Sequence, residues 1–600
     1  MNNENWTLKN VVGDEASLIN ELGIGYIMAR TLVNRGMDTP DKARKYLYPS
    51  INDLYDGSLL YNAFEAALLL KEKIINGKTI SIIGDYDVDG ITSTYLLKKH
   101  LNRFAKRYGA KIYSRIPHRV LDGYGINKEM INEAIELGTD TIITCDNGIS
   151  AFEAVAYAKE CNLSVIITDH HEVKRTLIDG KLQDEIPVAD IVVNQNLEAD
   201  KCPNKHMCGA LTAYKVIECL YKSFEEKLDK EKDLLMLSLA TVCDVMPLED
   251  ENRMIYRLAM DEYNKNGEEN TGLKALIKTA LKTEDGETMP KLSCYSIGHV
   301  LGPCINATGR LESADLSLEL LEEENYDSAV EKAQKLIELN AVRKDMTIDA
   351  LAQAVELIEK KASEKGKLDD IIVVYMTKCH ESLAGILAGR IREKYQRPSF
   401  VFTGNDILKG SARSITAYSL YEELTKVSDL MIRFGGHPMA AGVSINSDKL
   451  EEFTEALNEK ANLKEEDFKK KIVIDGVLPF DRVGVKDVLE LAMLEPFGKG
   501  NEKVIFAERD CLIKGIRYIG KNNNYLRFRL QNSFGKTYDA SLFKEASEVL
   551  KYLNEKFGQV SVNRMLEGKT TGDKISIAYV PQYNCYNGVE KVQCILESIS

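Results

Sequence analysis

Acidic and histidine side chains recur directly after short apolar stretches in the first half of the chain. The stretches are GDYDVDG (84–90), TCDNG (144–148), DHH (169–171) and CDVMPL (243–248). Neighbouring carboxylates repel one another unless cations neutralise them. Oxygen ligands with only one or two histidines favour Mg²⁺ or Mn²⁺ over a structural zinc ion. These side chains are too many for one ion, so they predict a site for two divalent cations: Asp85, Asp87, Asp89, Asp146, Asp169, His170, His171 and Asp244.

The apolar runs that precede these side chains predict strands of one sheet, with the side chains together at one edge of that sheet. Apolar runs at 79–84, 140–145, 163–168 and 189–194 alternate with helical patterns, which indicates βαβ units and a mostly parallel sheet. The runs are apolar throughout, as expected for strands covered on both faces. Ligands of such sheets bind outside the carboxyl ends of the strands. Residues 234–248 predict a buried helix that ends near Asp244 and adds this carboxylate to the edge.

The rest of the chain predicts an α/β protein of several domains. We expect an N-terminal segment (1–50), a catalytic α/β domain (51–315) and charged connecting helices (316–365). A second, smaller α/β domain follows (366–465), and short alternating strands predict a C-terminal β-barrel of the OB type (466–600).

Composition restricts the classes of function. With 600 residues, 44% hydrophobic and 28% charged, the chain is typical of globular proteins. A net charge of −14 argues against a protein that coats nucleic acid through a basic surface, although it allows a local basic groove. The polar N-terminus and the absence of a long apolar run predict neither a signal peptide nor a membrane span, and hence a cytoplasmic protein.

The individual residues also allow other interpretations. Asp85 alone could cap a helix, and His170 alone could be a buried structural histidine. Cys202, His206 and Cys208 form one tight group among twelve scattered cysteines, which allows a zinc site, but a fourth ligand is missing and free buried cysteines are the better explanation. Acidic or histidine-bearing turns at four successive element ends favour the cation site over these separate explanations.

The motifs GDYDVDG, TCDNG, DHH and CDVMPL, in this order, resemble those of the DHH phosphoesterase superfamily. Further stretches resemble its RecJ family of single-strand-specific exonucleases, over most of the chain from about residue 50. These stretches are IPHRVLDGYGIN (116–127), LGPCINATGRL (301–311), GSARS (410–414), GGHPMAAG (435–442) and EPFGKGN (495–501).

The resemblance implies a DHH domain with two metals, a connecting helix, a DHH-associated domain and an OB-fold. It implies a 5′-to-3′ exonuclease that acts on single-stranded DNA in recombination and repair. Two Mg²⁺ or Mn²⁺ ions would assist phosphodiester hydrolysis and the release of nucleotide 5′-monophosphates. The implied partners are single-stranded DNA, a RecQ-type helicase and a single-strand-binding protein, with no membrane and a monomeric enzyme.

The same resemblance implies roles for particular residues. Asp87, Asp89, Asp146, His170 and Asp244 are the expected metal ligands, with Asp87 and Asp89 on different metals and Asp146 bridging. Asp85 and His171 are expected at the catalytic centre, as ligands or as supports of ligands, and Asp169 is expected to support them. The expected phosphate-binding residues are Arg310, Ser411, Arg413 and His437, with His380 and Arg390 as looser matches.

The sequence departs from the family pattern at two positions, and it leaves open one alternative role for residues of the last domain and two alternative functions. Cys304 stands where the family usually has arginine, and Ser382 where it usually has glycine. Basic and aromatic residues of the last domain could stack bases or fill its core: Arg517, Tyr518, Lys521, Tyr525, Arg527 and Phe528. The alternative functions are a phosphodiesterase for short oligonucleotides or cyclic dinucleotides, which would lack the barrel, and an inactive DNA-binding scaffold, which would have lost metal motifs.

Overall fold

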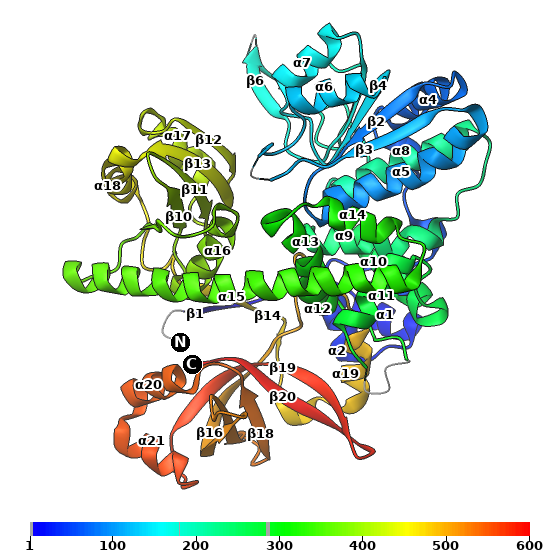
Figure 1. The fold of residues 1–600 in the computed structure, drawn as a ribbon. Coiled ribbons are helices and arrows are strands. Elements are labelled where there is room, and N and C mark those ends of the chain that lie inside the picture. Colours follow the sequence, from blue (N-terminus) through cyan, green and yellow to red (C-terminus); the bar gives the residue numbers. More distant parts are fainter. Residues whose placement is uncertain (1–3, 120, 179, 284–287) are drawn as a thin grey trace.

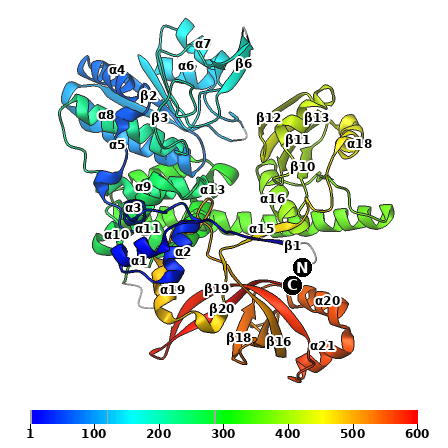
Figure 2. The ribbon, with the colours of Figure 1, turned by 180° about the vertical axis from the view of Figure 1, so that it is seen from behind.

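Two α/β lobes, one long helix and a β-barrel make up the protein. The computed structural model describes residues 4–119, 121–178, 180–283 and 288–600. Helix α15 (Tyr326–Lys365) passes along both lobes, and the barrel lies on the other side of this helix (Figures 1 and 2). In the described part of the chain, no helix is both long and apolar enough to cross a membrane.

The first lobe is built on a five-stranded, fully parallel sheet of order β3-β2-β4-β5-β8. Because all strands run the same way, the segments after β2, β4 and β5 emerge at one edge. This sheet confirms the predicted parallel α/β domain. Its strands are β2 (Thr79–Ile83), β3 (Lys111–Arg115), β4 (Thr141–Cys145), β5 (Ser164–Thr168) and β8 (Ile191–Val193).

Helices cover both faces of this sheet, as its apolar strands require. Ile143 and Ile166 pack with the helices of one face, and the adjacent Ile142 and Val165 pack with those of the other. One face carries α4 (Ala63–Ile75), α5 (Val88–Tyr108) and α8 (Gly209–Ser223), and the other carries α6 (Lys128–Glu136) and α7 (Phe152–Glu160). The helices that continue toward α15 are α9 (Leu234–Cys243), α10 (Asp250–Asn266), α11 (Thr271–Ala280), α13 (Gly302–Leu311) and α14 (Asp315–Glu322).

The second lobe has a mixed sheet of order β12-β13-β11-β10-β9, in which only β9 and β10 pair in parallel. The predicted second α/β domain corresponds to this lobe. Its strands are β9 (Ile372–Tyr375), β10 (Ser399–Gly404), β11 (Ile407–Arg413), β12 (Arg433–His437) and β13 (Ala440–Asn446). Its helices are α16 (Ala384–Tyr395), α17 (Leu420–Thr425) and α18 (Leu450–Lys460).

The C-terminal sheet closes into a barrel because β16 pairs with both β17 and β19. This closure confirms the predicted OB-type barrel, to which α20 (Ala546–Phe557) and α21 (Gln559–Leu566) are added between β18 and β19. The strands are β15 (Gly476–Val477), β16 (Phe506–Ile519), β17 (Tyr525–Gln531), β18 (Thr537–Leu542), β19 (Lys574–Tyr586) and β20 (Val589–Ile599).

The N-terminal segment packs with the C-terminal domain. Strand β1 (Glu4–Leu8) pairs in parallel with β14 (Lys470–Ile474), and α1 (Glu15–Leu22), α2 (Tyr26–Asn34) and α3 (Pro40–Leu47) share the barrel's hydrophobic core. The buried Arg253 of α10 fastens this unit to the first lobe. Its guanidinium lies 3.5 Å from the centroid of the Tyr46 ring, and its Nη2 donates to the Met493 carbonyl at 2.9 Å.

A buried polar network fixes α5, α8 and α9 relative to one another. The Asp233 carboxylate, just before α9, accepts hydrogen bonds from Lys99 Nζ at 2.6 Å and Tyr214 Oη at 3.1 Å, and lies 3.0 Å from His100 Nε2. Burial alone would raise the pKa of Asp233, but the hydrogen bond from His100 and the nearby positive charges lower it. These three helices bear Asp89, Gly209 and Asp244 at their ends.

We predict that Asp233→Ala lowers the free energy of unfolding of the first lobe by about 3 kcal/mol, because it leaves buried polar partners without an acceptor. Since the folded-state pKa of Asp233 is lowered, the stabilisation is present above its unfolded pKa of about 4 and is lost as the pH falls through the folded pKa. Hydrogen exchange of the α5 and α8 amides at pH 7 measures the effect. The exposed Asp229 provides the control Asp229→Ala, and equal protection in both variants would contradict the prediction.

Candidate metal centre

The loop between β2 and α5 carries the first carboxylates. Asp87 caps α5, because its Oδ1 accepts hydrogen bonds from the amides of Asp89 at 3.0 Å and Gly90 at 3.1 Å. The preceding Asp85 is 3% exposed. The backbone of Asp85 lies so close to Gly90 that a Cβ there would be 2.5 Å from its nitrogen and its carbonyl oxygen. A glycine at position 90 is therefore needed to fold the loop back on itself.

Asp89 is oriented by the first turn of α8. Its Oδ2 accepts from the Gly209 amide at 2.6 Å, and its Oδ1 accepts from the Ala210 amide at 2.8 Å. The free N–H groups at a helix N-terminus stabilise a negative charge. Even so, burial and the charge of Asp87 raise the pKa of Asp89 to about 7. The N-terminus of α8 alone thus does not offset the repulsion between Asp89 and the neighbouring carboxylates.

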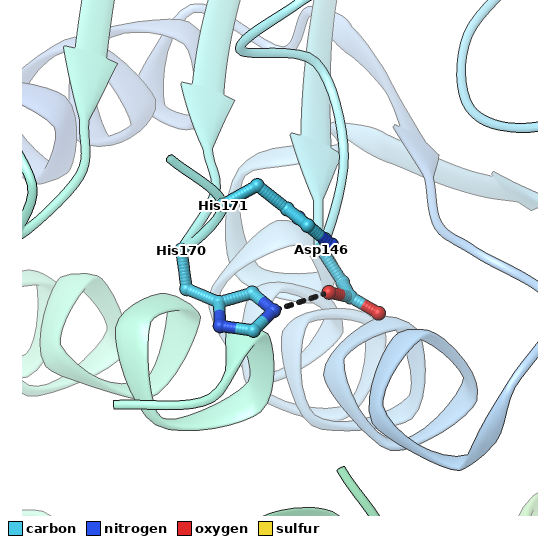
Figure 3. Close-up of side chains that lie close together, drawn as sticks. All are labelled: Asp146, His170 and His171. Carbon is cyan, nitrogen blue, oxygen red and sulfur yellow. Dashed lines mark ion pairs between the residues drawn. The ribbon is translucent and has the colours of Figure 1, made fainter. Parts of the chain in front are cut away.

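Asp146 and His170 face each other across the carboxyl ends of β4 and β5 (Figure 3). His170 Nε2 lies 3.1 Å from Asp146 Oδ1, 3.8 Å from Asp89 Oδ2 and 3.7 Å from Asp244 Oδ2. Burial and the charge of His171 lower the pKa of His170 to about 3, so the ring is neutral at pH 7. A neutral imidazole whose nitrogen faces carboxylate oxygens is a ready cation ligand.

The donor atoms of the centre fit two divalent cations. Ligand atoms of Asp89, His170 and Asp244 lie within 4.8 Å of one another, and so do those of Asp85, Asp87 and Asp146. The same holds for Asp146, His170 and His171. Burial, followed by the charges of neighbouring aspartates, raises the pKa values of Asp85, Asp146 and Asp244. Among the buried atoms without a hydrogen-bond partner in the described residues, three belong to this centre: Asp85 Oδ1, His170 Nε2 and Asp244 Oδ2. Bound cations would satisfy these atoms and remove the repulsion.

Asp169 holds the histidine pair in place. The buried carboxylate accepts hydrogen bonds from the amides of Ile149 at 2.9 Å and His170 at 2.7 Å, and lies 2.7 Å from His171 Nδ1. Burial would lower the pKa of His171, but the charge of Asp169 and this hydrogen bond raise it to about 9. Asp169 is thus occupied by hydrogen bonds to the turn and by its contact with the His171 ring.

The predicted phosphate-binding residues lie on both lobes, and His437 of the second lobe lies beside the centre. The His437 ring lies 6.4 Å from the His171 ring, nearly parallel to it. Arg310 of α13 reaches across and donates from Nη1 to the Ser382 carbonyl at 2.5 Å. Ser411 and Arg413 lie together beside Gly385, where a Cβ would be 3.0 Å from Ser411 Oγ and 3.2 Å from Arg413 Nη2.

The looser matches lie farther along the second lobe. His380 caps the short helix Glu381–Leu383, and its Nδ1 lies 2.7 Å from Ser382 Oγ. This contact gives Ser382 a local structural role. The Arg390 side chain is 62% exposed on α16.

Other predicted candidates lie elsewhere. Cys202 and Cys208 are buried and His206 is exposed, and they form no metal-binding group in the described parts of the chain. In the barrel, Phe528 is a core residue, whereas Arg517 pairs with Asp539 at 2.9 Å on the surface.

Sequence reasoning missed several residues that shape the centre. Tyr124 Oη donates to the Asp146 carbonyl at 3.1 Å and lies 3.2 Å from His171 Nδ1. Asn306 Oδ1 accepts from the Val88 amide at 3.1 Å and supports the acidic loop. The Arg119 guanidinium stacks 4.6 Å from the centroid of the Tyr86 ring. Tyr124, Asn306 and Arg119 belong to stretches that the sequence singles out, but their partners are remote in the chain.

Comparisons with known proteins agree with this architecture. Three family profiles match: the DHH family N-terminal domain at residues 79–241, the DHHA1 domain at 369–463 and the RecJ OB domain at 474–598. The single-stranded-DNA-specific exonuclease RecJ of Bacillus subtilis is 31% identical over 97% of this chain and 69% of its own length. The Escherichia coli protein of the same name is 33% identical over 67% of each chain.

A solved structure supports the fold over the whole chain. RecJ of Thermus thermophilus in complex with Mn²⁺ superposes with a TM-score of 0.80 at 24% identity, covering 100% of this chain and 80% of its own. The chain therefore belongs to the RecJ family, as the sequence motifs predict.

We predict that Gly209→Ala weakens divalent-cation binding about 10- to 100-fold, because its Cβ would lie 2.6 Å from the Asp146 Cβ and displace that carboxylate. Isothermal titration with Mn²⁺ measures the effect. Gly476→Ala is the matched control, since its Cβ meets only the Phe506 ring at 3.6 Å. Equal Mn²⁺ affinity in the two variants would contradict this account of Gly209.

Proposed function

We propose that the protein is a metal-dependent exonuclease specific for single-stranded DNA, which acts from the 5′ end and releases nucleotide 5′-monophosphates. The single observation that carries this proposal is the group of crowded carboxylates and a neutral histidine with unpartnered donor atoms at one sheet edge. Membership of the RecJ family, whose relatives are named single-stranded-DNA-specific exonucleases, supports it. We place the enzyme in DNA recombination and repair.

The proposed metal ligands are Asp87, Asp89, Asp146, His170 and Asp244. Asp146 is the proposed shared ligand, because it groups with Asp85 and Asp87 and also with His170 and His171. Divalent cations held there would supply Lewis-acid stabilisation of the phosphodiester and an activated water. Mn²⁺ and Mg²⁺ are the candidates, since RecJ structures with each of them share this fold. The amides at the start of α8 orient Asp89. Asp85 and His171 would lie beside the bound phosphodiester.

Substrate binding in this proposal comes from the side that faces the second lobe. Arg310 and Arg413 would contact phosphate, because guanidinium groups pair with phosphate oxygens through two parallel hydrogen bonds. Ser411 would add a hydroxyl donor beside Arg413. His437 would close over the centre from β12, next to His171. Both lobes are thus needed to hold the scissile phosphodiester.

The barrel supports a strand-binding enzyme over the alternatives. A phosphodiesterase for dinucleotides has no need for an added OB domain, and an inactive scaffold would not retain every acidic motif. We propose that the enzyme is cytoplasmic, since all twelve of its cysteines are free, as in a reducing compartment. We also propose that it is a monomer. A RecQ-type helicase and a single-strand-binding protein are its proposed partners.

We predict that Asp146→Ala lowers Mn²⁺-dependent release of mononucleotides from single-stranded DNA by ~10³-fold or more, because the groups that Asp146 forms with Asp85 and Asp87 and with the two histidines both lose a carboxylate. Circular dichroism checks that the variant folds. Asp349→Ala removes an exposed carboxylate from α15 and should retain activity. Unchanged activity of Asp146→Ala would refute the two-cation mechanism.

We predict that a block at the 5′ end of an oligonucleotide stops degradation, whereas a block at the 3′ end does not. The test follows mononucleotide release from 5′-blocked, 3′-blocked and unblocked strands of DNA and of RNA, with Mg²⁺ and with Mn²⁺. The RNA strands show whether the sugar affects cleavage. Protection by the 3′ block alone would reverse the proposed polarity and leave the nuclease activity in place.

A further inference from the structure

Arg343 belongs to α15, the helix that passes along both lobes (Figure 1), and is held in a fixed orientation. Asn340 Oδ1 accepts from its Nε at 3.2 Å and from its Nη2 at 2.9 Å. Asn340 is itself 4% exposed, and its amide donates to Cys304 Sγ on α13 at 3.4 Å. A buried amide anchored on a neighbouring helix therefore restricts this guanidinium and reduces the entropy that it would lose on binding a ligand.

Arg343 has no acidic partner among the described residues, unlike other cations of the same helix. Lys332 lies 2.7 Å from Glu323, and Lys335 lies 2.8 Å from Glu312. The two hydrogen bonds to Asn340 leave the remaining Arg343 donors free to bind a ligand. A partly buried arginine without a carboxylate or phosphate bears an uncompensated desolvation cost.

Neighbouring arginines increase this cost. Burial and the charge of Arg390 lower the pKa of Arg343, against the opposing effect of Cys304. Burial and the charges of Arg119 and Arg343 lower the pKa of Arg310 to about 9. Arg390 of α16 is 62% exposed and lies 3.6 Å from Glu393. Arg310 and Arg343 come from α13 and α15, so two separate elements place positive charge close together in a protein whose net charge is −14. Such a convergence is stable when an anion binds there.

The position of Arg343 relative to the metal centre indicates which anion. Arg310 interacts with Asp87 of the acidic loop, and it reaches the second lobe at Ser382. The charge of Arg343 acts on Arg310, and Asn340, which holds Arg343, contacts Cys304 on α13, the helix that bears Arg310. Arg343 therefore adds a cation on α15 to the one that Arg310 places near the acidic loop. A phosphodiester strand, which presents a charge at every linkage, matches such a pair of cations.

We propose that Arg343, oriented by Asn340, binds a backbone phosphate of the single strand adjacent to the scissile phosphodiester. This inference rests on the proposed function, because it assumes that single-stranded DNA is the ligand. It assigns to α15 a direct part in substrate binding, beyond its connection of the two lobes.

The test measures DNA binding without cleavage. Fluorescence anisotropy of a labelled oligonucleotide, in EDTA and over a series of KCl concentrations, gives the affinity and its salt dependence. We expect Arg343→Ala to weaken binding about tenfold, as for a lost hydrogen bond to a charged group, and to reduce the salt slope by about 0.7. Arg343→Lys should restore the slope, since it restores the charge. Lys332→Ala is the control, because it removes a paired cation from the same helix.

Neutral methylphosphonate linkages identify the contacted phosphate. Replacing one linkage at a time should weaken binding of the unaltered protein at the Arg343 position and leave binding of Arg343→Ala unchanged there. Asn340→Ala should reproduce part of the loss, because it frees the guanidinium. If Arg343→Ala binds every oligonucleotide as Lys332→Ala does, this inference is wrong, whereas failure of the proposed function would be seen independently as undiminished cleavage by Asp146→Ala.

Discussion

The burial of several carboxylates at one edge of a parallel sheet is the constraint on which the rest of the structure depends. Asp85, Asp89 and Asp146 are each 3% exposed or less, and their pKa values are raised by burial and by mutual repulsion. Without compensation, such a group would destabilise the fold. The helices and loops around the carboxylates reduce this destabilisation before cations bind.

Backbone groups provide the first compensation. The α8 amides bond both oxygens of Asp89, and Gly209 lets this helix end approach Asp146. Asp146 itself has a left-handed backbone with φ 61°, a conformation that aspartate tolerates better than most residues. The network around Asp233 then fixes the three helices whose ends meet at the centre. The rigidity of the first lobe thus serves to hold its charges in place.

Positive charge provides the second compensation and extends the site into the other lobe. Arg310 crosses from α13 to Ser382, and His437 reaches His171 from β12. The arginines repel one another as the carboxylates do. Bound cations would relieve the repulsion among the carboxylates, and the phosphate of a bound phosphodiester would relieve the repulsion among the arginines. This complementarity explains why the two lobes face each other over a centre of opposite charges.

The sequence by itself determined the parallel sheet, the barrel and the group of acidic and histidine residues. These follow from local patterns: apolar runs define strands, and the residues after parallel strands must share an edge. The order of the motifs likewise sufficed to indicate the family. In each case the information lies within a few neighbouring residues of the chain.

Only the tertiary structure decided the contacts between distant segments. It places α8 against Asp89, joins the N-terminal helices to the barrel core, and orients Arg343 through Asn340 and Cys304. It also separates His206 from the buried Cys202 and Cys208, which adjacency in sequence does not reveal. Such contacts depend on how elements pack, and packing is governed by shape and burial over the whole molecule rather than by local spacing.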